Sequence, residues 1–179
     1  MRSRKKELEE SMAHSRTIRD GLIVGLIAYA AVALFYTVFD LLAARGALYT
    51  VDLLGRALFQ GLRDPAILMF PIARDWTAIL LYNAFHLLVS LGIGLLVVSL
   101  IAHAERYPPQ ALLVLIMIVA GGVLTIFGVG YLTESVRPLL PWWSIAVANV
   151  VAVLFAGLYL VRRRPGLWQR LNPLALIQS

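Results

Sequence analysis

Residues 77–103 form an uninterrupted run of 27 residues that contains no acidic residue, lysine, arginine or proline. A helix of about 20 apolar residues crosses the hydrocarbon core of a bilayer, so this run is long enough to span a membrane with some tilt. Asn83, His86 and Ser90 interrupt the run at spacings of three and four, which places them on one face of a helix. Because a histidine inside a membrane helix needs a polar partner, we expect the other spans to provide one.

Three other apolar runs have the length of membrane spans, at about 21–44, 111–132 and 141–161. Hydrophobic residues make up 60% of the chain, whereas about 45–50% is typical of soluble domains. The sequence therefore predicts an all-α membrane protein whose four-helix transmembrane domain covers residues 21–164.

The long connection between the first two spans, residues 45–76, contains a helical pattern. Thr50 is suited to an N-cap, and Asp52 to the first turn, of a helix that continues to Leu62. Apolar side chains share one face of this helix and polar side chains point elsewhere, the apolar ones being Val51, Leu54, Leu58 and Leu62, and the polar ones Asp52, Arg56 and Gln60. We predict an amphipathic interfacial helix in the first outer loop, roughly parallel to the membrane.

Basic residues are divided unequally between the two sides of a four-span bundle. The side with both termini carries 11 lysines and arginines, and the side with residues 45–76 carries 5. Cytoplasmic loops are enriched in such residues, so we expect both termini to be cytoplasmic in a multi-pass protein of the bacterial inner membrane. Residues 1–20 predict a polar cytoplasmic tail, solvated or helical, and residues 165–179 predict a tail that lies along the membrane surface.

Each span offers a polar side chain to the half of the membrane nearest residues 45–76. At a rise of about 1.5 Å per residue, His86 lies about 14 Å below Thr77, and Asn149 about 10 Å below Trp142. Lipid cannot satisfy such groups, so they are expected to face the bundle or a cavity. The candidate polar layer comprises Tyr36, Asp40, Asn83, His86, Ser90, Thr125 and Asn149. We predict that His86 is held by a hydrogen bond from another helix, with Asn149 the best partner by depth, Tyr36 next, and Asp40 through water third.

Small residues lie at helical spacings in three of the spans. Glycine and alanine let helix backbones approach one another closely in a membrane. The candidate packing residues are Gly21, Gly25, Gly121, Gly122, Ala148, Ala152 and Ala156. Gly92 and Gly94 mark a further place where another helix is expected to come close.

Several kinds of chemistry are excluded by what the sequence lacks. The chain has no cysteine, which excludes disulfides, thiolate metal sites and c-type haem attachment. Only His86 lies deep in a span, so a bis-histidine haem has no second ligand at its depth. Asp40 and His86 supply at most two metal ligands. The net charge of +6 is not accompanied by interleaved aromatics, so we expect no nucleic-acid partner, and likewise no cofactor, metal site or catalytic site.

The run FYTVFDLLAARGALYTVDLLGRALFQG at 35–61, with YNAFHLL and WWSIAVAN further on, resembles a segment of uncharacterised bacterial four-span integral membrane proteins. The resemblance covers most of the chain after residue 20. It implies the four-span fold and carries no activity with it.

Three interpretations of the polar layer remain open: cross-helix bonds that fix the register of the bundle, a binding site for a small ligand such as a quinone headgroup or a lipid, and proton or ion passage through Asp40 and His86. Proton passage has a weakness, because residues 87–100 of the second span offer only Ser90 and Ser99. We expect a non-catalytic accessory or structural subunit of a larger membrane complex, of respiratory or photosynthetic type. The alternative is a small ligand-binding or transport protein that uses the polar layer.

Overall fold

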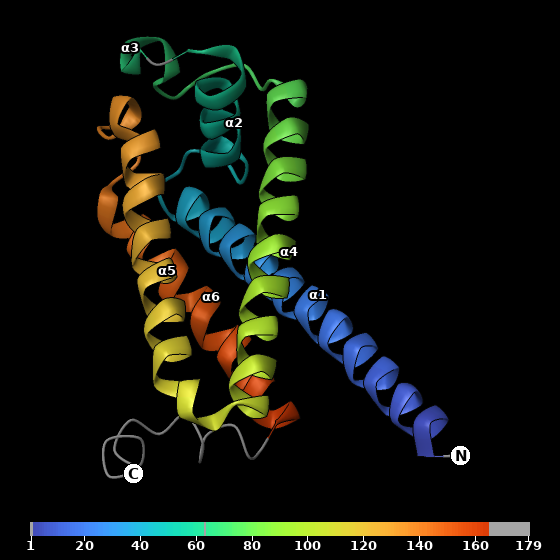
Figure 1. Ribbon diagram of the computed structural model, residues 1–179. Helices are drawn as coiled ribbons and strands as arrows, with labels where there is room; N and C mark the ends of the chain where they lie inside the picture. Colours follow the sequence, from blue (N-terminus) through green and yellow to red (C-terminus); the bar gives the residue numbers. More distant parts are fainter. Residues whose placement is uncertain (1, 63, 165–179) are drawn as a thin grey trace.

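The computed structural model describes residues 2–62 and 64–164, and this part of the chain is helical with short connections and contains no strand. Four of its helices are long and apolar enough to cross a membrane, and they pack as a four-helix bundle (Figure 1). They are α1 (Arg2–Leu42), α4 (Trp76–Arg106), α5 (Ala111–Leu132) and α6 (Trp142–Arg163). The predicted fold class is confirmed, and the chain is a multi-pass membrane protein.

The polar N-terminal segment continues the first span without a break. α1 contains 41 residues, which gives it a length of about 62 Å, twice the thickness of a bilayer core. Of the two forms expected for the tail, solvated or helical, the structure has the helix. Residue 20 is not a structural boundary, because Asp20 lies inside α1 and is only 2% exposed. The surface-lying tail predicted at 165–179 lies outside the described residues.

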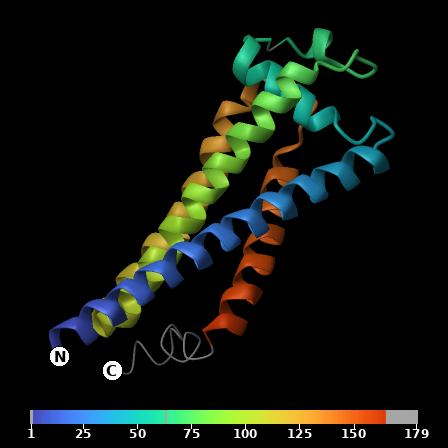
Figure 2. The ribbon, with the colours of Figure 1, turned by 90° about the vertical axis from the view of Figure 1, so that its right-hand side faces the viewer.

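α1 crosses α4 obliquely, as both views of the ribbon show (Figures 1 and 2). A Cβ atom added to Gly25 would lie 2.6 Å from the Cα of Leu91, and one added to Gly21 would lie 2.8 Å from the Cα of Leu95. On the facing helix, a Cβ on Gly94 would lie 2.7 Å from the Cα of Gly25. The two backbones therefore meet directly, which only residues without a side chain permit.

The connection between α1 and α4 covers one end of the bundle, which we call the loop end (Figure 1). It contains α2 (Tyr49–Gly55), a π-helical turn η1 (Arg56–Gln60) and the short α3 (Pro65–Leu68). The opposite end, with the N-terminus of α1 and the link between α4 and α5, is the terminal end. The described part of the chain also contains two short 3₁₀ turns, η2 (Pro108–Gln110) before α5 and η3 (Glu134–Val136) after it.

The predicted helix in the long connection is confirmed over α2 and η1, but its polar face is assigned wrongly. Asp52 was expected on the polar face, and it is buried at 2% exposure. On the predicted apolar face, Leu54 is buried in the protein, and Leu58 is 41% exposed, as a side chain facing lipid would be. α2 packs against the protein at the loop end, so a carboxylate with polar partners occupies the buried side. Its orientation relative to a membrane surface remains a prediction.

The largest hydrophobic cluster also lies at the loop end, where α2 and α3 cover the ends of the long helices (Figure 1). Its fully buried members come from four separate elements or connections: Leu53, Leu68, Val136 and Leu140. Further along the spans most large apolar side chains remain exposed on the bundle surface. This distribution suits a bundle whose outer surface is covered by lipid.

Local signals explain where α4 begins and ends. The carboxylate of Asp75 accepts a hydrogen bond from the backbone N–H of Ala78 at 3.0 Å, which caps the first turn. At the other end, the consecutive prolines Pro108 and Pro109 follow Tyr107, and proline disfavours helical geometry in the residue before it. α4 therefore ends at Arg106.

We predict that replacing Gly94 by alanine destabilises the bundle, because the new methyl group would press against the backbone of α1 at Gly21 and Gly25. The expected loss is about 1–3 kcal/mol of unfolding free energy, typical of overpacking. Gly92→Ala is the matched control two residues away, since nothing lies within 4 Å of its Cβ position. Thermal unfolding in detergent should show a lower melting temperature for Gly94→Ala alone, and equal effects of both changes would contradict the close contact.

Candidate functional site

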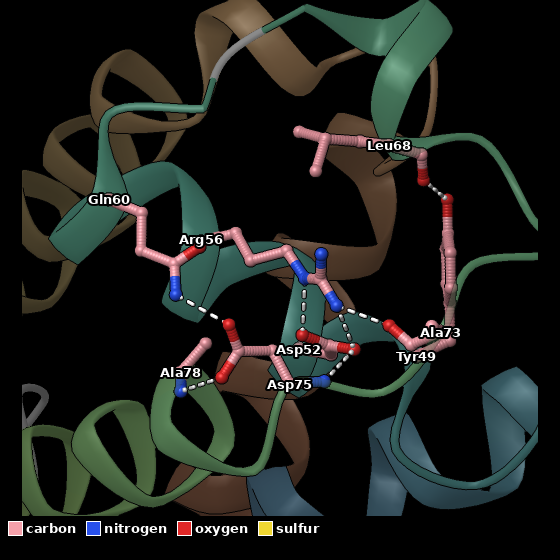
Figure 3. Close-up of polar contacts among 8 residues, drawn as sticks. All are labelled: Tyr49, Asp52, Arg56, Gln60, Leu68, Ala73, Asp75 and Ala78. Carbon is pink, nitrogen blue, oxygen red and sulfur yellow. Dashed lines mark hydrogen bonds and ion pairs between the residues drawn. The ribbon is translucent and has the colours of Figure 1, made fainter.

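A network of charged and polar side chains joins α2 and η1 to the start of α4 (Figure 3). Arg56 donates from Nε to Oδ1 of Asp52 at 2.7 Å and from Nη2 to Oδ2 at 3.3 Å. Arg56 also donates to the backbone carbonyl of Ala73. The hydrogen bond to Asp52 raises the pKa of Arg56 above its usual value, so the guanidinium stays charged. Nε and Nη2 of the guanidinium are both used, and the pair with Asp52 joins two residues one helical turn apart.

Asp75 connects this pair to the first turn of α4. Its backbone N–H donates to Oδ2 of Asp52 at 3.2 Å, and its own Oδ2 accepts from Nε2 of Gln60 at 2.6 Å (Figure 3). The bond from Gln60, together with the backbone N–H of Ala78, holds the pKa of Asp75 below its ordinary range. Asp75 therefore remains ionised at neutral pH and fastens η1 to α4.

Asp40 of α1 closes the start of α2. It is 0% exposed, and its two oxygens accept from the backbone N–H and the hydroxyl of Thr50, each at 2.7 Å. The sequence predicts Thr50 as the N-cap, but the helix begins after Leu48 and Thr50 serves as a donor to Asp40. Hydrogen bonds to a charged acceptor are stronger than those to a neutral one. Thr50 therefore stabilises the structure more by donating to the buried carboxylate of Asp40 than it would by capping a backbone N–H.

Arg45 fills the space between the end of α1 and the connection before α6. Its Nη1 donates to the carbonyl of Leu139 at 2.9 Å, and its guanidinium lies 5.5 Å from the ring centre of Tyr49. The Tyr49 hydroxyl donates to the carbonyl of Leu68 at 2.9 Å (Figure 3). Burial raises the pKa of Tyr49, so its hydroxyl keeps its proton. These bonds satisfy backbone carbonyls that the loop would otherwise leave buried.

A second charged cluster lies at the terminal end and joins three of the long helices. Arg164, directly after α6, donates to Oε2 of Glu105 on α4 at 2.6 Å and to Oδ2 of Asp20 on α1 at 3.3 Å. The hydroxyl of Tyr159 donates to the other oxygen of Asp20 at 3.4 Å. Asp20 and Glu105 thus each accept a hydrogen bond from the segment that ends α6. These contacts hold α1, α4 and α6 together at the terminal end.

A third polar group lies within the spans, between α1 and α4. Tyr29 donates from its hydroxyl to Oδ1 of Asn83 at 2.9 Å, and the amide of Asn83 donates to the carbonyl of Ile79 at 2.9 Å. His86 packs between two tyrosine rings, with centroids 5.2 Å from Tyr29 and 5.8 Å from Tyr82. Its imidazole makes no hydrogen bond among the described residues.

The two direct partners predicted for His86, Asn149 and Tyr36, are wrong, and the water-mediated contact with Asp40 stays a prediction. Asn149 donates to the carbonyl of Ile145 in its own helix at 2.8 Å, since a side-chain amide can bond the preceding turn. Tyr36 pairs with Oγ of Ser144 across α1 and α6 at 3.4 Å, and Asp40 is occupied by Thr50.

The predicted polar layer is therefore divided among separate local contacts. Thr125 donates to the carbonyl of Gly121 in its own helix at 2.8 Å, so it does not reach another span. Ser90 is buried where α1 crosses α4, and its carbonyl lies against Gly25. Asn83 and His86 have a common neighbour in Tyr29, which contacts Asn83 through its hydroxyl and His86 through its ring.

The predicted packing residues also separate into two groups. Gly21 and Gly25 lie in the α1–α4 contact, Ala148 and Ala152 of α6 are buried, and Ala156 packs against the cluster of Val24, Val98, Ile101 and Leu160. Gly121 and Gly122 of α5 have nothing within 4 Å of their Cβ positions, and neither has Gly92 of α4. The close approach expected at these three glycines does not occur within the described chain.

Sequence reasoning missed the Asp52–Arg56 pair and the cluster of Asp20 with Arg164. The Asp52–Arg56 pair could have been predicted from the sequence, because the two residues are spaced i,i+4 on a helix, as ion pairs often are. No sequence pattern predicts the contact of Asp20 with Arg164, since the two residues lie 144 residues apart in the chain. Within residues 2–62 and 64–164, no three histidine, aspartate or glutamate side chains are grouped as metal ligands.

Comparisons of the chain with protein-family models, with curated proteins and with solved structures found no match.

We predict that Thr50→Val destabilises the loop end. It removes the hydroxyl that donates a hydrogen bond to Oδ1 of Asp40, while the carboxylate stays buried. The expected cost is about 1–3 kcal/mol of unfolding free energy, as for a buried acceptor left without its donor. Thr50→Ser keeps the hydroxyl and is the control, with a smaller loss from the missing methyl group. Chemical unfolding in detergent measures both, and a Thr50→Val variant as stable as Thr50→Ser would contradict the assignment.

Proposed function

We propose that this protein is a non-catalytic accessory or structural subunit of a larger membrane complex. The observation that carries the proposal is the surface of α5. Three of its glycines, Gly121, Gly122 and Gly128, have nothing within 4 Å of their Cβ positions. Each glycine inside a helix costs about 1 kcal/mol relative to alanine, and lipid gives nothing in return for it. A helix of another protein packed against α5 supplies the missing contact.

The spacing of these residues supports this proposal. Gly121, Thr125 and Gly128 lie at i, i+4 and i+7, which puts them on one face of α5. The hydroxyl of Thr125 is turned back onto Gly121, so it presents no unsatisfied group on that face. Such a face of small side chains is the surface by which helices associate in membranes.

The charged groups at the two ends of the bundle also favour a structural role. Asp40, Asp52 and Asp20 are each buried and bonded to donors of this chain, which suits anchors of the fold better than reactive groups. Conversion of a substrate requires a group free to bind it, and these carboxylates are already engaged.

We further propose that the terminal end faces the cytoplasm of a bacterial cell and that the protein resides in the inner membrane. The excess of arginine and lysine on the side of the termini supports this orientation. Because the chain has no cysteine, single cysteines report each side. In intact cells, a membrane-impermeant maleimide should label Ala73→Cys at the loop end and leave Ser3→Cys unlabelled until the cells are opened. Labelling of Ser3→Cys in intact cells would reverse the orientation.

The subunit role is tested by purification in mild detergent. We expect the protein to copurify with a partner in fixed stoichiometry, and Gly121→Leu with Gly128→Leu to reduce that yield at least tenfold, because two isobutyl groups block the close approach. Val119→Leu on the same helix is the control, since it enlarges an exposed side chain that is already branched. A lone monomer or dimer in the wild-type preparation would refute the proposal.

A further inference from the structure

His86 stands out among the polar side chains of the spans because its hydrogen-bonding groups are unused. A neutral imidazole has one donor and one acceptor, and leaving either in hydrocarbon costs several kcal/mol. Tyr29, Asn83, Thr125 and Asn149 all make hydrogen bonds within the described chain. The imidazole of His86 and the hydroxyl of Tyr82 make none there.

The two unused groups are held together and remain partly accessible. Tyr82 and His86 lie one turn apart on α4, with ring centroids 5.8 Å apart at an interplanar angle of 34°. The ring of Tyr29 lies across the helix contact, 5.2 Å from His86 and tilted by 54°. Its hydroxyl is fixed by Asn83. Both His86 and Tyr82 are half-buried, so each keeps part of its surface exposed.

The depth of this group limits what it binds. His86 lies ten residues from Trp76, about 15 Å along α4, so a phospholipid headgroup or ester carbonyl at the membrane interface does not reach it. Two arginines at the loop end are already engaged, Arg56 with Asp52 and Arg45 with the carbonyl of Leu139. With no free cation beside it in the described chain, the group suits a neutral ligand dissolved in the bilayer.

The chemistry of the group fits a flat ligand with carbonyl oxygens. The imidazole N–H and the Tyr82 hydroxyl are both donors, which match carbonyl acceptors. Three aromatic rings offer faces and edges for packing against a conjugated ring. We propose that His86 and Tyr82, with Tyr29 beside them, bind the headgroup ring of a lipid-soluble quinone. This site lies on α1 and α4 and is independent of the subunit role, which rests on α5.

A titration of the purified protein in detergent micelles with a short-chain benzoquinone tests the site, with calorimetry as the readout and empty micelles as the blank. The wild type should bind saturably at one site per chain. His86→Leu should weaken binding at least tenfold, since it removes the donor and one ring. His86→Gln restores a donor and should recover part of that loss, and Tyr82→Phe should weaken binding several-fold because it removes only the hydroxyl.

Thr125→Val is the matched control, because it removes a polar group that bonds only within α5, and its binding should equal that of the wild type. Thermal unfolding of each variant separates lost binding from lost folding. If His86→Leu does not fold, Tyr82→Phe against Thr125→Val decides the test. Absence of saturable binding by the wild type, or equal binding by wild type and Tyr82→Phe, overturns the proposal. Loss of a copurified partner from His86→Leu, without quinone binding by the wild type, assigns the group to a protein interface instead and also overturns it.

Discussion

Backbone meets backbone where α1 crosses α4, because Gly21, Gly25 and Gly94 leave no side chains between the two helices. The crossing sets the position of the polar groups on both helices. It brings Tyr29 against Asn83 within the spans, and it holds Asp20 and Asp40 of α1 beside the polar groups at the two ends of the bundle. A membrane gives helices little hydrophobic reason to associate, so direct contact of this kind and hydrogen bonds between helices take its place.

The four spans were predictable because a helix in lipid needs only length and apolar composition, both of which are local properties of the chain. The partners of polar residues were not, since they depend on how the helices rotate against one another. Asn149 illustrates the difficulty: its depth matches that of His86, but its amide finds an acceptor in its own preceding turn. Depth along a helix is a one-dimensional property, and a hydrogen bond requires that two helix faces also meet.

The buried face of α2 escaped prediction for a related reason. Amphipathic reasoning assigns the apolar face to the membrane, and it assumes that charged side chains point to water. Asp52 instead lies inside the protein, where Arg56 and the backbone N–H of Asp75 satisfy it. A connection packed on the end of a bundle has many buried backbone groups to satisfy, and carboxylates and guanidinium groups serve that need.

The continuity of α1 has a mechanical consequence. Asp20 and Asp40 lie on one unbroken helix, about 30 Å apart, and each is bonded to a different part of the protein. Turning α1 about its own axis, or sliding it along that axis, would break both attachments in the same movement and would drive side chains into the glycine contact between them. Because α1 is attached at both Asp20 and Asp40, it resists rotation about its axis and sliding along it.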